Sequence, residues 1–217
     1  MFHGLKNLII QKILENVGKN IKTMVGHVVP LLDLSHVQFV HATTLGADGV
    51  TDAPLHTYRD ADQVRIERWI MDKKPPAMFA TAGNFLGNVD RWQLISWTAP
   101  THVVIDAGCA NAGTGAKDGN RNEGITVYSN HTITPETNDS CHYFWHHARN
   151  YRLDDTELTK FLANAAQTAF GEDVDILAAQ QRNIDSAGRH WEGIDINADA
   201  GVLQARRVVT KMLEAET

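Results

Sequence analysis

Cysteine, long apolar runs and excess positive charge are all scarce in this sequence. Its 217 residues include two cysteines, Cys109 and Cys141, too few for a disulfide framework, a four-thiolate zinc site or a four-cysteine iron–sulfur cluster. No apolar run approaches the roughly 18 residues needed to cross a bilayer, and no signal-peptide pattern opens the chain. The formal net charge of −6 argues against general nucleic-acid binding. We therefore expect a cytoplasmic protein without nucleic-acid or membrane partners.

The composition is otherwise that of an ordinary globular protein, apart from its eleven histidines. Hydrophobic residues make up 43% of the chain and charged residues 21%, which excludes wholesale disorder. The length suits one domain, with or without a short appendage. The histidines are therefore the feature that calls for an explanation.

The N-terminal segment has the pattern of an amphipathic helix. Apolar residues recur every four positions from Leu5 to Ile21, which places them on one stripe of a helix about five turns long. Residues 1–22 also carry four lysines against one glutamate. We expect this helix to pack on the domain or on a second subunit rather than on a membrane surface.

Patterns typical of strands occupy the middle of the chain, and patterns typical of helices occupy its end. Ala99-Pro100 suits a tight antiparallel turn, and the glycine-rich segment 110–124 is typical of a mobile loop. We expect helices over about 154–182 and 201–215. An antiparallel sheet closed by one long helix predicts an α+β fold in which the sheet wraps around that helix. The expected strands are 64–70, 92–97, 101–106, 124–132 and 141–148.

One carboxylate lies on the apolar side of the expected long helix. Asp173 follows Leu162 by eleven residues and Ala169 by four, so it falls within the stripe that faces the core. A core-facing carboxylate is costly unless a cation, a metal or good donors compensate it. A buried arginine, a position at the edge of the core, or a metal would each account for Asp173. Glu172 and Asp175 point elsewhere and are expected to be solvated charges.

Two histidines, His36 and His41, lie five residues apart in an otherwise apolar stretch. On a regular helix this spacing turns the two side chains about 140° apart, so they converge only if the helix is bulged or broken. Either one alone would be a core histidine bonded to a backbone carbonyl. Together with Asp173 they could form a two-histidine, one-carboxylate face, whose open positions suit ferrous iron and dioxygen.

Three segments resemble one family in sequence and in order. They are LLDLSHVQFVHATTLG, NHTITPETNDSCHYFWHHARNYRLDD and AFGEDVDILAAQQRNID. The chain is identified as a member of the Rieske non-haem iron oxygenases of the vanillate O-demethylase and dicamba monooxygenase type, and it resembles their catalytic domain. The resemblance implies a helix-grip domain of the START and Bet v 1 type over 30–217. Residues 1–29 would form an atypical amphipathic helix before it.

The resemblance also implies a set of site residues and a reaction. Iron would be held by His36, His41 and Asp173; Asp33 would bridge toward the Rieske cluster of a neighbouring subunit, and His131 would face a small aromatic substrate. The chemistry would be insertion of oxygen from O2 into a substrate C–H bond at mononuclear Fe(II), including oxidative O-demethylation. Electrons would come from a Rieske-type or reductase partner. Three further histidines are expected on a strand without iron contact: His142, His146 and His147.

The sequence departs from the family pattern in two places. A Rieske centre needs a Cys-x-His and a Cys-x-x-His pair, and neither cysteine is followed by such a histidine. The first 29 residues are also too few for a Rieske domain, so we expect no [2Fe–2S] ligands in this chain. Pro30 stands where relatives usually have asparagine. The resemblance implies a homotrimer, although without a Rieske domain half of the head-to-tail contact would be missing.

Two alternatives to an oxygenase follow from these departures. The first is an inactive helix-grip domain that binds a hydrophobic or aromatic small molecule. The second is a metal-assisted hydrolase, which fits less well because the sequence indicates no general base near the three ligands. Retention of all three ligands favours the oxygenase.

Overall fold

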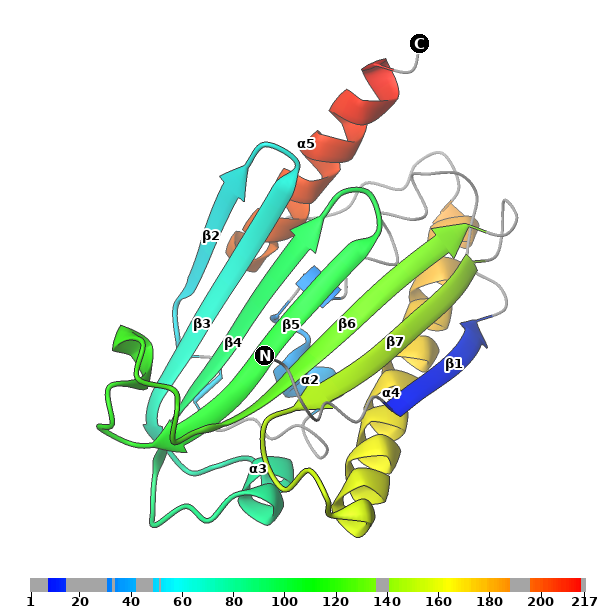
Figure 1. Ribbon diagram of the computed structural model, residues 1–217. Coiled ribbons are helices and arrows are strands. Elements are labelled where there is room, and N and C mark those ends of the chain that lie inside the picture. The colour runs from blue at the N-terminus through cyan, green and yellow to red at the C-terminus, as the bar shows by residue number, and fades with distance from the viewer. Residues whose placement is uncertain are drawn as a thin grey trace.

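Seven antiparallel strands form one sheet on which the helices pack (Figure 1). The structure, a computed structural model, describes residues 8–14, 31–32, 34–41, 49–50, 52–135, 141–187 and 196–215. The strands are β1 (Leu8–Leu14), β2 (Leu55–Asp60), β3 (Gln63–Lys73), β4 (Val89–Thr98), β5 (His102–Asn111), β6 (Ile125–Pro135) and β7 (Cys141–Arg149). Their order across the sheet is β1-β7-β6-β5-β4-β3-β2. From β2 to β7, each strand therefore pairs with the strand that precedes or follows it in the chain.

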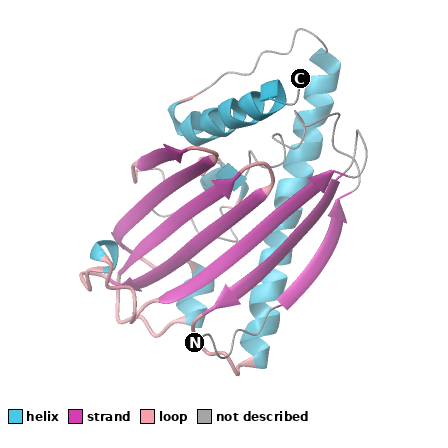
Figure 2. Cartoon of the chain, turned by 45° about the horizontal axis from the view of Figure 1, so that its top comes forward, coloured by secondary structure: helices cyan, strands magenta, loops and turns pink. Residues whose placement is uncertain are grey.

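The helices gather on one face of this sheet. Those in the described residues are α2 (Val37–Val40), α3 (Ala77–Ala82), α4 (Thr156–Ala187) and α5 (Ala200–Ala215), with 3-10 turns η1 (Ala116–Asp118) and η3 (Asn197–Asp199). Figures 1 and 2 show α2, α4 and α5 on the same side of the strands. α4 begins where the Leu158 N–H donates to the Asp155 carboxylate at 2.8 Å. The expected α+β helix-grip architecture is confirmed.

The core follows from the alternation of side chains along the strands. In β3, the buried residues Val64, Ile66 and Ile70 share one face, and more exposed residues lie between them. Buried apolar side chains on this face form two clusters. The first joins the α2 segment and α5 to the sheet, through Leu34, Val37, Ile66, Ile95 and Val208. The second joins α3 and α4 to the sheet, through Phe79, Val89, Cys109, Val127, Leu158 and Leu162.

The helix predicted near the N-terminus is wrong over the residues that the structure describes there. Leu8–Leu14 forms β1, which pairs antiparallel with β7 from Leu8 opposite His147 to Leu14 opposite Cys141. The physical reason is the open edge of β7, whose unpaired N–H and C=O groups accept another strand. A segment rich in isoleucine and leucine can satisfy that edge as well as it can form a helix. The remainder of the predicted helix lies outside the described residues.

The segment predicted as a mobile loop, 110–124, has fixed contacts instead. It folds over the outer face of the sheet, where Ala116 and Trp92 bury each other in a small cluster. Arg121 lies over the Trp92 ring, 5.2 Å from its centroid, and donates to Asp106 at 2.7 Å. The prediction of a mobile loop from its glycine content is therefore wrong. The segment packs on Trp92 and removes that side chain from water.

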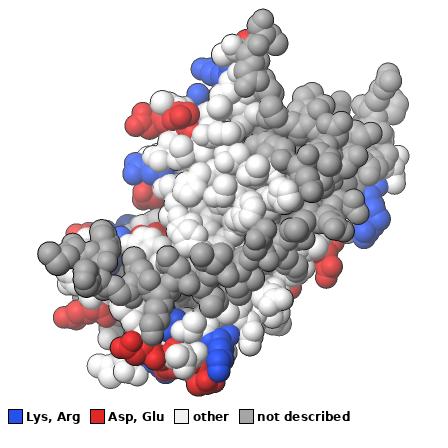
Figure 3. Space-filling model, turned by 45° about the vertical axis from the view of Figure 1, so that its right-hand side comes forward, with Lys and Arg blue, Asp and Glu red and all other residues white. Residues whose placement is uncertain are grey.

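Charged side chains of both signs lie on the face of the molecule shown in Figure 3. In Figure 3 the described Lys and Arg side chains are interspersed with Asp and Glu along the edges of the face in view. Within the described residues, no helix combines the length and apolarity that a membrane crossing requires.

Candidate metal centre

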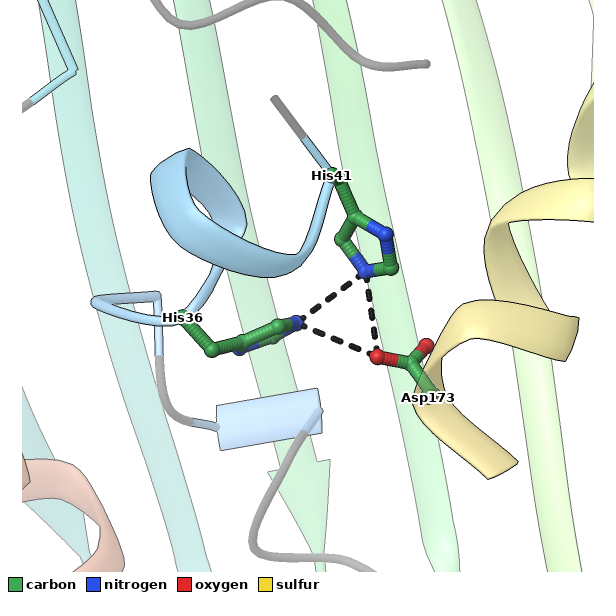
Figure 4. A group of neighbouring side chains, drawn as sticks. All are labelled: His36, His41 and Asp173. Atoms are coloured by element: carbon green, nitrogen blue, oxygen red, sulfur yellow. Dashed lines mark hydrogen bonds and ion pairs between the residues drawn. The ribbon is translucent and has the colours of Figure 1, made fainter. Parts of the chain in front are cut away.

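Two histidines flank a single helical turn, and an aspartate faces them from the long helix (Figure 4). His36 directly precedes α2 and His41 directly follows it. At His41 the backbone has left the helical region, with φ −105° and ψ 25°. Because the helix ends there, the two rings converge, whereas on a continuing helix they would diverge. Asp173 reaches them from the middle of α4.

The donor atoms of these three side chains lie close enough to share one ion. His36 Nε2 lies 3.3 Å from His41 Nε2 and 3.6 Å from Asp173 Oδ1, and His41 Nε2 lies 3.1 Å from the same oxygen. Donors bonded at about 2.1 Å are about 3.0 Å apart at right angles and about 3.4 Å apart in a tetrahedron. The site therefore fits a metal ion with two nitrogen ligands and one oxygen ligand, in either geometry.

The electrostatics of the site favour a cation. His41 is buried, and burial on its own would lower the pKa of the imidazole. Hydrogen bonds from the ring to Asp173 and Glu172, with the attraction of both negative charges, outweigh burial and raise that pKa above 6.5. A proton or a metal ion is thus stabilised between these groups.

Glu172 is part of the site, and its prediction as a solvated charge is wrong. Its Oε2 lies 2.8 Å from His41 Nδ1. Successive residues of a helix point about 100° apart, and the His41 ring lies between the directions of Glu172 and Asp173. When Nδ1–H donates to Glu172, the lone pair of Nε2 remains for a metal. The signal in the sequence was that Glu172 and Asp173 are adjacent carboxylates. Helix geometry alone placed Asp173 toward the core and Glu172 in solvent.

Asp173 lies at the boundary of the core, with its side chain 19% exposed. One of the three explanations offered for it, a position at the edge of the core, therefore applies. Its contacts with His36 and His41 make it also the third member of the donor cluster. The edge position leaves room for a ligand beside the carboxylate, since one side of the group remains accessible.

His131 lies within the sheet and is not a member of the donor cluster. Its ring is fully buried on β6, with Nε2 2.7 Å from Ser129 Oγ and Nδ1 2.6 Å from Tyr143 Oη. Burial lowers the pKa of this imidazole to about 3, helped by His147 and other nearby histidines. His131 is therefore neutral at physiological pH, and both of its nitrogens are engaged by hydroxyl groups.

Sequence reasoning missed the support that β3 gives to the segment that carries His36. Arg68 Nη1 donates to the Leu34 carbonyl at 2.9 Å and so ties the chain just before His36 to the sheet. Arg68 lies on the same inner face of β3 as Val64 and Ile66. Their spacing of two residues is the signal in the sequence that could have placed Arg68 on that face.

The other predicted site residues either do not belong to the donor cluster or lie outside the described residues. Asp33 lies outside the described residues. The ring of His147 packs against Trp145, with centroids 5.0 Å apart. Three histidines on β7 do not belong to the donor cluster found among the described residues: His142, His146 and His147.

Fold and site together define a class: a helix-grip domain whose long helix presents a carboxylate to two histidines. A family model described as the vanillate O-demethylase oxygenase C-terminal domain matches residues 30–215. The chain belongs to this family.

Relatives share the sequence over most of this chain. A vanillate O-demethylase oxygenase subunit from Pseudomonas sp. (strain ATCC 19151) is 36% identical over 191 residues, which are 86% of this chain and 58% of that protein. A toluene-4-sulfonate monooxygenase system iron-sulfur subunit from Comamonas testosteroni is 33% identical over 190 residues, 86% of this chain and 54% of that protein. The chain thus spans little more than half the length of the curated relatives it matches.

Solved structures share the fold. Dicamba monooxygenase bound to 3,6-dichlorosalicylic acid matches with a TM-score of 0.85 and 22% identity, over 100% of this chain and 62% of that one. A structure of the same enzyme with non-haem iron and dicamba matches with a TM-score of 0.73 and 22% identity, over 99% and 60%. These matches agree with the helix-grip architecture described above.

Proposed function

We propose that this chain is the catalytic domain of a non-haem iron monooxygenase that acts on a small aromatic substrate with O2. The observation that carries the proposal is the convergence of His36, His41 and Asp173 within 4.8 Å of one another, in a family named for vanillate O-demethylase. Two imidazoles and one carboxylate on one face leave the remaining positions of Fe(II) open. The reaction is oxidative O-demethylation or hydroxylation.

In this proposal iron supplies the place where dioxygen is bound and reduced. The chain's own residues hold the geometry: His36 and His41 present Nε2, Asp173 presents Oδ1, and Glu172 fixes the tautomer of His41. Hydroxylation of a methyl ether gives a hemiacetal, which collapses to a phenol and formaldehyde. One oxygen atom of O2 enters the substrate and the other leaves as water, with two electrons and two protons supplied from outside.

The electrons come from a Rieske-type or reductase partner. The sequence contains neither a Cys-x-His nor a Cys-x-x-His pair, which supports delivery from another chain or domain. We assign to Asp33 the bridge toward that donor, and we propose a homotrimer in which the donor belongs to a neighbouring subunit. Ferrous iron and the buried free thiol of Cys109 both suit a reducing compartment, which supports a cytoplasmic location.

His131 is proposed to position the substrate. Both ring nitrogens are engaged by Ser129 and Tyr143, so this role requires a substrate group to replace one of the two hydroxyls. The neutral state of His131 supports hydrogen bonding rather than ion pairing.

Metal content tests the proposal directly. The chain is reconstituted anaerobically with Fe(II), desalted, and analysed for iron, in the wild type, Asp173→Ala and Asp175→Ala. We expect about one iron per chain in the wild type and in Asp175→Ala, whose exposed carboxylate lies two residues further along the same helix. Asp173→Ala should lose most of the iron, because it removes one of only three protein ligands.

Two outcomes would overturn the proposal. A wild type that retains no stoichiometric iron would leave the ligand-binding helix-grip domain as the better description. Equal iron in the wild type and Asp173→Ala would show that the metal binds elsewhere.

A further inference from the structure

One of the four tyrosines in the sequence has its hydroxyl bonded to a histidine. Tyr143 Oη lies 2.6 Å from His131 Nδ1, at the short end of the range for a hydroxyl donor. The two rings also stack, with centroids 5.8 Å apart and planes 11° apart. The phenol proton of Tyr143 is therefore in direct contact with a nitrogen base.

Tyr143 donates this hydrogen bond and His131 accepts it. His131 is the hydrogen-bond partner of the Tyr143 hydroxyl among the described residues, and a buried O–H needs an acceptor. Burial lowers the pKa of His131 to about 3, so its neutral ring keeps a lone pair on one nitrogen. Burial and the negative charge of Asp173 raise the pKa of Tyr143 above its usual range, so the phenol keeps its proton. With Nδ1 as the acceptor, Nε2–H of His131 donates to Ser129 Oγ at 2.7 Å.

The Tyr143–His131 pair lies close to the metal centre. The ring of Phe170 packs against both members, with its centroid 6.2 Å from that of Tyr143 and 5.6 Å from that of His131. Phe170 precedes Asp173 by three residues on α4, which is about 4.5 Å along the helix axis. One aromatic ring thus separates the pair from the turn of helix that carries the carboxylate of the donor cluster.

The other three tyrosines have different surroundings. Tyr58 and Tyr128 are exposed, and the hydroxyl of Tyr151 is buried without a hydrogen-bond partner in the described part of the chain. A phenol gives up an electron easily only when its proton leaves at the same time, because the phenol radical cation is a very strong acid. Of the four, Tyr143 has both a base for that proton and a position beside the metal centre.

We propose that Tyr143, with His131 as the acceptor of its proton, supplies one electron to strong oxidants formed at the metal centre when no substrate is bound. The proposal rests on the proposed function for the metal and adds a protective reaction to it. With hydrogen peroxide as the oxidant, Fe(II) and Tyr143 each give one electron, the O–O bond breaks, and two protons from solvent complete two water molecules. The phenol proton moves to His131 Nδ1 and leaves a neutral phenoxyl radical. A one-electron reductant restores Tyr143, whose proton returns from His131.

The arrangement limits this reaction to the substrate-free chain. A substrate that replaces the Tyr143 hydroxyl at His131 removes the base that accepts the phenol proton, so the tyrosine is then harder to oxidise. The side chains that the reaction protects are the metal ligands, since the imidazoles of His36 and His41 lie nearest to an oxidant formed at a shared ion.

Electron paramagnetic resonance tests the proposal. The chain is loaded anaerobically with Fe(II), mixed with one equivalent of hydrogen peroxide without substrate, and frozen rapidly. We expect the wild type to give a phenoxyl signal that narrows when its tyrosines carry ring deuterium. Tyr143→Phe should lose most of this signal. Tyr128→Phe, which makes the same change at an exposed position on the neighbouring strand β6, should keep it.

Two further measurements distinguish a redox role from a structural one. A nitroso spin trap followed by peptide mapping locates the radical in the unaltered chain, so this result does not depend on how a variant folds. Mass spectrometry after the peroxide treatment counts oxygen addition at His36 and His41, which should be several-fold greater in Tyr143→Phe than in Tyr128→Phe. Equal oxidation in the two variants would contradict the protective role.

Iron content, measured in the same samples, separates this proposal from the proposed function. Bound iron with no tyrosine radical, or a radical that persists in Tyr143→Phe, overturns the role of Tyr143 and leaves the oxygenase proposal standing. A Tyr143 radical that forms equally in Asp173→Ala would overturn the link to the metal centre. If the radical forms as expected but peroxide and bound iron oxidise no methoxybenzoate, only the proposed oxygenase function fails. A chain with neither iron nor radical overturns both.

Discussion

At the scale of single residues, His41 is the most constrained member of the candidate metal centre. Carboxylates approach both of its ring nitrogens, Asp173 at Nε2 and Glu172 at Nδ1. A ring held at both ends has one orientation, which lowers the entropy lost when a metal binds. His36, the other histidine of the cluster, is more exposed than His41. The two histidines therefore differ in how strongly the fold prearranges them.

Glu172→Ala should weaken metal binding without removing a ligand. We expect the affinity for Co(II) or Fe(II) to fall by about 10- to 100-fold, because the loss of such a supporting carboxylate releases the histidine. Glu172→Gln keeps an acceptor oxygen and should lose less. A competition titration against a chelator measures the affinities, with Asp175→Ala as the control on the same helix. Wild-type affinity in Glu172→Ala would show that the hydrogen bond to His41 does not support the site.

At the scale of elements, the sequence predicted the helices and strands whose structure depends on neighbouring residues in the chain. α4 and α5 appear close to the predicted ranges 154–182 and 201–215, because a long apolar stripe at helical spacing has few other uses. The N-terminal segment has a similar stripe, yet Leu8–Leu14 is a strand, since the decision depends on the edge of β7 more than 120 residues later. Sequence periodicity carries no information about that distant edge.

Gly108 of β5 lies against the Trp92 ring and the backbone of β6. A side chain at this position should destabilise the sheet there. A Cβ there would lie 2.3 Å from the Ile125 carbonyl oxygen and 2.4 Å from the Trp92 ring. We expect Gly108→Ala to reduce the free energy of unfolding by about 1–3 kcal/mol through overpacking, measured by urea denaturation. Gly87→Ala, where a Cβ meets nothing within 4 Å, should stay within about 0.5 kcal/mol of the wild type. Equal stability of the two variants would contradict the close packing at Gly108.

At the scale of the whole molecule, polar groups lie on the same sheet face as the two apolar clusters. This face carries Arg68, Arg91, Gln93 and His131 among aliphatic and aromatic residues. The sequence could predict that His36, His41 and Asp173 come together, because each lies in a short segment that resembles the family. It could not predict the arginine and glutamine group, because the expected strand 92–97 began one residue after Arg91. Which strand residues face inward becomes known only once the register of the sheet is fixed.

Two histidines on this face, the fully buried His131 and the half-buried His147, should make the folded chain sensitive to acid. Burial lowers the pKa of His147 to about 4 and that of His131 to about 3, whereas both titrate near 6.5 in an unfolded chain. Below pH 6.5 these histidines therefore bind protons in the unfolded state but not in the folded state. Their neutral burial leaves the free energy of unfolding unreduced above pH 6.5 and lowers it as the pH falls toward 4. Each histidine contributes up to about 1.4 kcal/mol per pH unit.

His147→Phe isolates one of these contributions. The Nε2 atom of His147 is buried without a hydrogen-bond partner, and its ring packs near Trp145 and Phe170, so phenylalanine can occupy the same space. Urea denaturation at pH 7 and pH 5 should show a loss of stability that is smaller in the variant than in the wild type by about 2 kcal/mol at most. Other titrating groups are common to both proteins and cancel in this difference. Identical pH dependence in the two proteins would mean that His147 takes up its proton in the folded state, and that the interior of the sheet is more accessible to water than its burial indicates.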